Sequence, residues 1–450
     1  MPPFAMALPF LVVLLCIALL PLIGATEHWW HKNKSKLLVS AVMGLVTLTY
    51  YFIAQGMHGV ETVLHHAVLD EYIPFMALLF SLYTIAGGIE LSGDLKAHPR
   101  TNVTFIAVGA LIASFVGTTG AAMLLIRPLL RTNRERKHVV HTVIFFIFAV
   151  CNCGGLLLPI GDPPLFLGYL KGVPFTWTLQ LWPEFLVVNG MLLATYFVWD
   201  MRAYKQEEAK DIQADDTQIE PLRLTGKLNL LLLLGVVLCV ALLDPSKQFP
   251  GTDWSAPKFL REVLMFGLAG MSYFLPFFTP KGLRERGSFD FFAINEVACL
   301  FIGIFITMQV PLAILNGGAG AQLGVDSSLK FFFATGGLSA FLDNAPTYVV
   351  FFELAKSLNP SITVPLGSML EMPAIGDAVA TSISESLLAA ISCGAVFMGA
   401  LTYIGNGPNF LVKAIAEQAG VRMPSFFGYM KYSVLILGPI LAVTAVIFFL

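Results

Sequence analysis

The sequence predicts an all-α polytopic membrane protein made of two inverted repeats, each with five membrane crossings plus a re-entrant hairpin, and with broken helices at the centre. Three observations predict this fold: the composition, a helix-breaking motif that occurs twice, and the distribution of basic residues among the loops. Of the 450 residues, 56% are hydrophobic and 12% are charged, and a soluble protein of this length could not hide so much apolar surface. The net charge of −2 offers no positive field for nucleic acid, and the sequence indicates no cofactor.

The first copy of the motif is Cys-Gly-Gly-Leu-Leu-Leu-Pro-Ile-Gly-Asp-Pro-Pro-Leu-Phe at residues 153–166. A helix over 139–170 must break here, because Pro159 and Pro163 lack the backbone donor and clash with the preceding turn. In hydrocarbon, backbone groups freed by a break are tolerated only where they line a protein-enclosed cavity. We therefore expect Asp162, the one carboxylate of this segment, to lie in such a cavity.

The second copy is Tyr-Ile-Gly-Asn-Gly-Pro-Asn-Phe at residues 403–410. In the alignment of the two copies, Gly161 matches Gly405 and Asp162 matches Asn406. Broken apolar segments at matching positions in two halves indicate a secondary transporter whose binding site lies between them.

The first repeat covers residues 1–199. Its opening apolar run lacks the basic start and the small-residue cleavage site of a signal peptide, so we expect a membrane helix there. Two apolar arms around residues 117–120 are each shorter than the ~20 residues of a full crossing, which predicts a re-entrant hairpin. The expected elements are helices near 4–23, 37–55 and 72–91, the hairpin over 102–130, the broken helix over 139–170 and a helix near 180–199.

Residues 200–226 carry dense charges of both signs and no apolar periodicity, which is typical of a linker between halves. The second repeat, 227–450, follows the order of the first. Because each half crosses the membrane an odd number of times, the second half is inverted relative to the first. Its expected elements are helices near 227–243, 259–278 and 291–315, a hairpin over 329–356, a broken helix over 381–418 and a final helix over 428–449.

Loop charges orient this topology. If the linker over 200–226 is cytoplasmic, 21 of the 27 Lys and Arg residues fall in loops on the cytoplasmic side, as the positive-inside rule predicts. Both termini are then extracytoplasmic. The six exceptions are Lys171, Lys247, Lys258, Arg261, Lys330 and Lys356.

Residues 154–162, Gly-Gly-Leu-Leu-Leu-Pro-Ile-Gly-Asp, and residues 339–346, Ser-Ala-Phe-Leu-Asp-Asn-Ala-Pro, carry a resemblance to a known family. The chain resembles the ion transporter superfamily, in particular its branch of arsenite permeases and NhaD-type sodium/proton antiporters, in which some relatives are labelled citrate transporters. The resemblance implies a homodimer in the bacterial inner membrane, with hairpins and broken helices that move as an elevator. The first hairpin departs from the family, because it reads Gly-Thr-Thr-Gly at 117–120 where antiporters of this branch have a second Asp-Asn.

A carboxylate at membrane depth costs about 2.5–3.5 kcal/mol on insertion scales, so Asp162 and Asp343 need compensation. Each could cap the half-helix that follows it or could bind a proton or cation, and the membrane context favours binding. Both are candidate Na⁺ ligands, and at Asp343 we expect sodium and proton to compete. The remaining predicted ion- or substrate-binding residues are Thr118, Thr119, Gly161, Asn344, Gly405, Asn406 and Asn409.

These observations favour Na⁺ (or Li⁺)/H⁺ antiport over the alternative, transport of a citrate-like organic anion or of arsenite. The alternative has support, because half-helix N-termini suit anions and the tip over 117–120 carries no negative charge. The protein is not expected to be an enzyme, since an intramembrane aspartyl protease needs two facing carboxyl groups and the repeat partner of Asp162 is Asn406. A channel would need a filter signature, and the sequence contains none.

Two further sets of polar residues, a histidine-rich segment and one arginine, are not expected to belong to the binding site. His58, Glu61, His65 and His66 recur at helical spacing before the third predicted helix, and we expect a solvated face rather than a metal site. Arg127, near the end of the first hairpin, is expected to extend its charge to the membrane interface.

Overall fold

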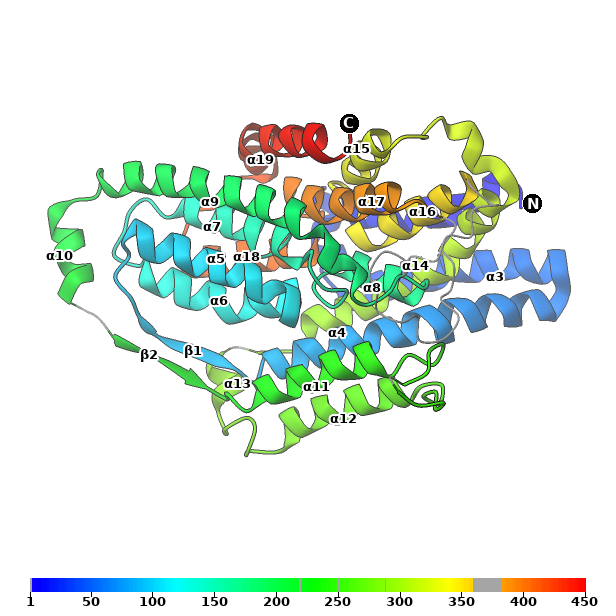
Figure 1. Ribbon diagram of the computed structural model, residues 1–450, viewed down its shortest axis with the longest axis horizontal. Coiled ribbons are helices and arrows are strands. Elements are labelled where there is room, and N and C mark those ends of the chain that lie inside the picture. The colour runs from blue at the N-terminus through cyan, green and yellow to red at the C-terminus, as the bar shows by residue number, and fades with distance from the viewer. Residues whose placement is uncertain (1, 218–219, 250, 288, 359–382) are drawn as a thin grey trace.

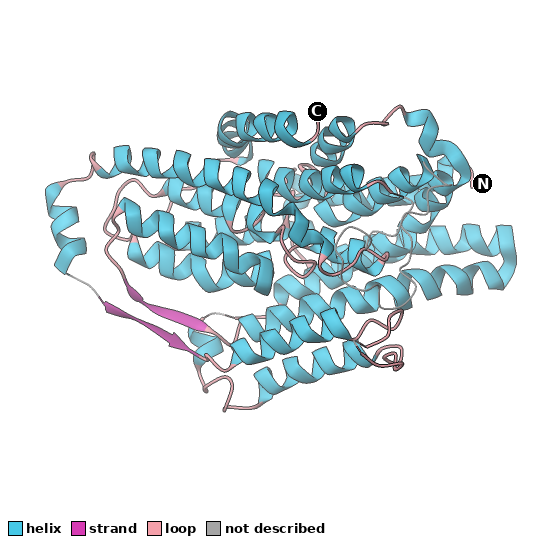
Figure 2. Ribbon diagram, viewed as in Figure 1, coloured by secondary structure: helices cyan, strands magenta, loops and turns pink. Residues whose placement is uncertain are grey.

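The computed structural model describes residues 2–217, 220–249, 251–287, 289–358 and 383–450 (Figures 1 and 2). Five helical segments of this part of the chain are long and apolar enough to cross a membrane, and the bent pair α1–α2 makes a sixth if it counts as one span. The predicted class, an all-α polytopic membrane protein, is therefore confirmed. The five segments are Asn33–Ala86, Pro99–Val116, Trp177–Tyr204, Phe292–Ala319 and Phe426–Phe448.

One set of helices, which we call the scaffold group, comes from the start of each half. Helices α3 and α14 pack along each other, as do α4 and α12. The Phe75 and Phe301 rings stack in this interface at 4.7 Å between centroids. The scaffold group comprises α1 (Leu8–Leu19), α2 (Gly24–Trp30), α3 (Asn33–Leu64), η2 (His65–Tyr72), α4 (Ile73–Ala86), α11 (Asn229–Leu242), α12 (Leu260–Phe274), α13 (Leu283–Arg286), α14 (Phe292–Ile314) and η5 (Leu315–Ala319).

Two predicted boundaries in the scaffold group are wrong. The loop expected between 55 and 72 is helical, and α3 turns within it at Gly56, where φ is 69° and ψ is −160°, a conformation open to glycine. The helix expected over 72–91 ends at Ala86, because the chain leaves the helix at Gly87 and Gly88 and enters a strand.

The other set, which we call the central group, contains both hairpins and both broken helices. Helix α6 packs on α18, α8 packs on α16, and α15 packs on α17. The first two residues of the broken helix expected over 381–418 lie outside the described part. The central group comprises α5 (Pro99–Val116), α6 (Thr118–Thr132), α7 (Val140–Ala149), η3 (Cys153–Gly155), α8 (Pro163–Leu170), α9 (Trp182–Tyr204), α15 (Ser328–Ser339), α16 (Asn344–Leu358), α17 (Glu385–Met398), η7 (Gly399–Leu401), α18 (Gly407–Gln418) and α19 (Phe426–Phe448).

The residues expected to form the linker between the halves, 200–226, contain the end of α9, helix α10 (Ala209–Thr217) and strand β2 (Glu220–Thr225). Strand β2 pairs antiparallel with β1 (Glu90–Asp94), and this ladder runs from the side of α10 toward α13 (Figure 1; magenta in Figure 2). Strand β1 connects α4 to α5, and β2 connects α10 to α11. The ladder therefore joins two of the chain segments that run between the scaffold and central groups.

Candidate functional site

The two broken segments have the same local conformation. Asp162 has φ −142° and ψ 141° before α8, and Asn406 has φ −152° and ψ 138° before α18. A Cβ atom on Gly161 would lie 2.2 Å from the Gly155 carbonyl oxygen, and a Cβ atom on Gly405 would lie 2.5 Å from the backbone of η7. The predicted glycines are thus needed because the backbone of each break passes close to itself.

Asp162 is the hub of the site, with a relative exposure of 1%. Its Oδ1 atom accepts hydrogen bonds from Thr118 Oγ1 at 2.9 Å and Asn406 Nδ2 at 3.0 Å. Its Oδ2 atom accepts from Asn344 Nδ2 at 2.7 Å. We call these four residues the Asp162 network; they come from both hairpins and both breaks, so four segments far apart in sequence meet at one carboxylate.

Four helices begin at the Asp162 network: α6 at Thr118, α8 at Pro163, α16 at Asn344 and α18 at Gly407. A helix N-terminus is equivalent to roughly half a positive charge. These N-termini place about two positive partial charges beside the Asp162 network, while α5, α7, α15 and α17 end at the same hairpin tips and breaks with C-termini of opposite sign. The four N-terminal amide groups can orient an anion locally, although the helix dipoles sum to about zero and the Asp162 network contains no Lys or Arg.

A second pair of amides supports the network. Asn152 Nδ2 donates to Asn409 Oδ1 at 2.7 Å, and Asn409 Nδ2 donates to the backbone oxygens of Gly399 and Thr402 at 2.9 and 3.0 Å. Sequence reasoning gave Asn409 a site role and Asn152 none. A polar residue in the middle of an otherwise apolar helix was the signal that could have identified Asn152.

Two buried amide oxygens near the network, Asn152 Oδ1 and Asn344 Oδ1, have no hydrogen-bond partner among the described residues. Both side chains border Gly399: a Cβ atom there would lie 3.1 Å from Asn152 Oδ1 and 3.6 Å from Asn344 Nδ2. Buried polar atoms are rarely left unpaired. Neutral oxygens beside a carboxylate are the hard ligands that Na⁺ and other small cations take.

Asp343 lies outside the Asp162 network. It is half-buried at the tip of the second hairpin, where its Oδ1 atom accepts from Ala345 N at 3.0 Å and its carbonyl oxygen accepts from Thr347 Oγ1 at 2.9 Å. These local bonds at the start of α16 match the capping alternative. Thr119, also predicted to bind the ion or substrate, follows Thr118 in α6 and is half-buried, and it too is not part of the network.

A buried ion-pair triad connects the two groups of helices. Lys171 Nζ, at the end of α8, lies 3.0 Å from Glu71 Oε1 on η2 and 3.1 Å from Glu353 Oε1 on α16. Glu71 belongs to the scaffold group, whereas the other two residues belong to the central group. The triad therefore joins the scaffold to the ends of two helices that begin at the Asp162 network.

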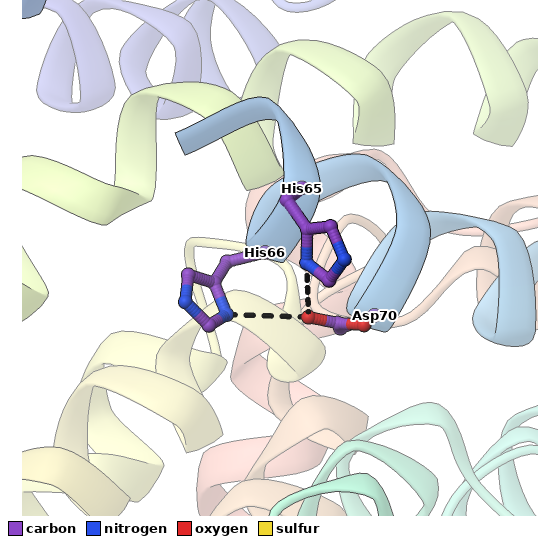
Figure 3. Close-up of side chains that lie close together, drawn as sticks. All are labelled: His65, His66 and Asp70. Atoms are coloured by element: carbon purple, nitrogen blue, oxygen red, sulfur yellow. Dashed lines mark hydrogen bonds and ion pairs between the residues drawn. The ribbon is translucent and has the colours of Figure 1, made fainter. Parts of the chain in front are cut away.

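The histidines before α4 are exposed, as predicted, together with His58 and Glu61. Figure 3 shows His65 and His66 on either side of Asp70, each with Nδ1 toward the same carboxylate oxygen, at 3.0 and 3.2 Å. Two imidazoles and a carboxylate form a donor set known from zinc sites. However, Lys258 Nζ lies 2.9 Å from the other Asp70 oxygen and already supplies a compensating positive charge.

Comparison with known proteins gives one family. No curated protein matches the chain. Residues 1–449 match a family with the description "Putative citrate transport", which names neither sodium nor arsenite. Since the match spans nearly the whole sequence, the chain belongs to this citrate-transport family and is an integral multi-pass membrane transporter.

Proposed function

We propose that the protein carries a citrate-like organic anion across the membrane by secondary transport, and that the Asp162 network forms its binding site. The observation that carries this proposal is the convergence of four helix N-termini on one buried carboxylate. Oriented backbone amides bind carboxylates without a basic side chain. The family description supports the same substrate class.

A coupling cation fits the same centre. The cation, Na⁺ or H⁺, would be held by Asp162, and Na⁺ would also take the unpartnered oxygens of Asn152 and Asn344. Two opposite unit charges about 4 Å apart attract each other by about 4 kcal/mol at an effective dielectric constant of 20. A bound cation would neutralise Asp162 and leave the positive helix ends free to bind the anion, so cation and anion would bind cooperatively.

We propose alternating access because the four helices that begin at the Asp162 network run toward two opposite sides of the membrane. Helices α6 and α18 pack together, as do α8 and α16, and all four begin at the network. In the proposed mechanism, residues 1–199 and 227–450 are inverted repeats, so the first pair runs to the cytoplasmic side and the second to the extracytoplasmic side. The central group then moves as an elevator against the scaffold group of a homodimer.

Na⁺ (or Li⁺)/H⁺ antiport is the second candidate. The observation that favours it is the fully buried carboxylate beside two unpartnered amide oxygens, which is the minimum set for exchange of a cation and a proton. Antiport differs from the first proposal in one measurable respect, because it needs no organic anion.

Purified protein in liposomes separates the two functions. Radiolabelled citrate uptake is measured with and without Na⁺ and proton gradients, and an internal pH dye reports proton movement in the absence of citrate. We expect saturable, cation-dependent citrate uptake, reduced at least tenfold by Thr118→Ala and unaffected by Thr49→Ala, a matched change at an exposed position of α3. A Na⁺-driven pH change with no citrate uptake would establish antiport instead.

A further inference from the structure

A second concentration of charge lies at the far ends of two helices that begin at the Asp162 network. A cavity of about 700 Å³ separates the last turns of α6 and α18. Six of its lining side chains are cationic, and none of its lining residues is acidic. The six are Arg127, Arg131, Arg134, Arg136, Lys137 and Arg422.

Three of these cations are already neutralised. Arg136 Nη2 lies 2.6 Å from Asp200 Oδ1, Arg134 is paired with Glu135, and Lys137 is paired with Glu208.

The other three, Arg127, Arg131 and Arg422, make no ion pair with any described residue. Arg127 is half-buried, nine residues into α6, and lines the cavity. The sequence-based interpretation, a charge extended to the membrane interface, does not explain why these three arginines share one concavity.

The position of the unpaired charge argues for a ligand. The C-termini of α6 and α18 each contribute roughly half a negative charge, and the paired cations Arg134, Arg136 and Lys137 each have a second acid within 4.0 Å, namely Asp94, Glu207 and Asp211. The excess positive charge is therefore confined to the three arginines without an ion pair to a described residue, which line a concave, partly buried site. Loop charge bias places basic residues on one side of a membrane, but it does not require them to share a cavity whose lining contains no acid.

We propose that this cavity binds a soluble multivalent oxyanion and serves as a second, outer subsite for the carboxylate substrate on the side of the membrane that holds α10 and the β1–β2 ladder. This inference rests on the proposed function. Guanidinium groups bind carboxylates through paired hydrogen bonds. A cleft lined by one sign of charge also raises the association rate of an oppositely charged ligand about 10- to 1,000-fold at low salt.

The test measures the electrostatic potential in the cavity from rates of thiol modification, and it does not depend on transport activity. Gln418→Cys places a thiol at an exposed position of the cavity lining, and Ala209→Cys places one on α10, outside it. Each variant is treated with an anionic and with a cationic methanethiosulfonate reagent, and the wild-type rate is subtracted. We expect the ratio of anionic to cationic rates to be at least tenfold higher at Gln418→Cys, to fall in 1 M salt, and to fall again with Arg127→Gln, Arg131→Gln or Arg422→Gln.

Ligand identity is tested on the same thiol. Citrate or inorganic phosphate at millimolar concentration should slow modification of Gln418→Cys in nanodiscs of neutral lipid. The proposal is overturned if the anionic-to-cationic rate ratios are equal at Gln418→Cys and Ala209→Cys. It is also overturned if the ratio at Gln418→Cys does not change with Arg422→Gln, a substitution of an exposed loop residue. Protection by anionic lipid but not by soluble anions would also overturn it. If the thiol results hold while wild-type liposomes take up no citrate, the proposed transport function fails and the anion cavity stands.

Discussion

Asp162→Asn should abolish coupled transport while leaving the fold intact. The substitution keeps the size of the side chain, and the new amide oxygen can still accept hydrogen bonds from Thr118 and Asn406. Its NH₂ group would face the Asn344 amide, which can rotate and present its unpartnered oxygen. The two retained hydrogen bonds each weaken by about 1 kcal/mol when the acceptor loses its charge. This loss of folding stability is offset because the folded variant no longer buries a charged carboxylate.

The transport effect is much larger than the stability effect. Loss of about 4 kcal/mol of attraction between Asp162 and a cation 4 Å away weakens cation binding about 1,000-fold. The cation-dependent part of initial citrate uptake into proteoliposomes, at a fixed Na⁺ and proton gradient, should therefore fall at least 100-fold, with a melting temperature within about 3 °C of wild type. The reasoning is refuted if this variant takes up citrate within threefold of wild type with unchanged cation dependence.

Asp343→Asn provides the comparison, because it removes the other candidate carboxylate. Asp343 Oδ1 accepts only from Ala345 N among the described contacts, and an asparagine oxygen can still accept that one bond. Uptake should fall by no more than about tenfold. A loss as large as that of Asp162→Asn would place the charge of Asp343 in the transport cycle, as the sequence predicted.

Three further changes test the framework of the site. Gly405→Ala should lower the melting temperature by several degrees, because the new Cβ atom meets the backbone at 2.5 Å, whereas Gly407→Ala, which has nothing within 4 Å, should be tolerated. Lys171→Met should lower the unfolding free energy by about 1–3 kcal/mol, because Glu353 then keeps only Lys356 at 3.9 Å and Glu71 keeps only the Gln309 amide at 3.2 Å. Adding Glu353→Gln should restore part of this loss, and an additive double mutant would show that the triad is not coupled. Burial raises the pKa of the Asp94 carboxyl in β1, so the folded state holds this proton more tightly than the unfolded state does. Stability should therefore fall as pH rises from about 4. Asp94→Asn should flatten that fall and raise the melting temperature at pH 7, and a pH profile of stability that is unchanged in the variant would contradict this expectation.

Much of the candidate site could be predicted from the sequence because its signals are local. Proline and glycine in an apolar run identify a break wherever it occurs, and polar residues at the breaks and tips are conspicuous in a membrane helix. Thr118, Asp162, Asn344 and Asn406 were all predicted as binding residues on these grounds, and the structure brings them together.

The relative importance of the two carboxylates could not be predicted, because it depends on packing. Asp162 is buried only because four segments from both halves of the chain surround it, whereas Asp343 remains half-buried at a hairpin tip. The β1–β2 ladder was missed for a different reason. Its strands are five and six residues long, and only β2 shows a short alternation, with Leu222 and Leu224 around Arg223. Their pairing across more than 100 residues of sequence is what defines them.

Equilibrium binding of radiolabelled citrate to the purified protein tests the central claim most directly. Bound citrate is measured over a range of Na⁺ concentrations and pH values, for wild type and for Thr118→Ala. The account predicts saturable citrate binding that tightens with the coupling cation, a reciprocal tightening of cation binding by citrate by the same factor, and a loss of affinity of at least tenfold in Thr118→Ala. Absence of citrate binding under every cation condition, or binding indifferent to the Asp162 network, would contradict it.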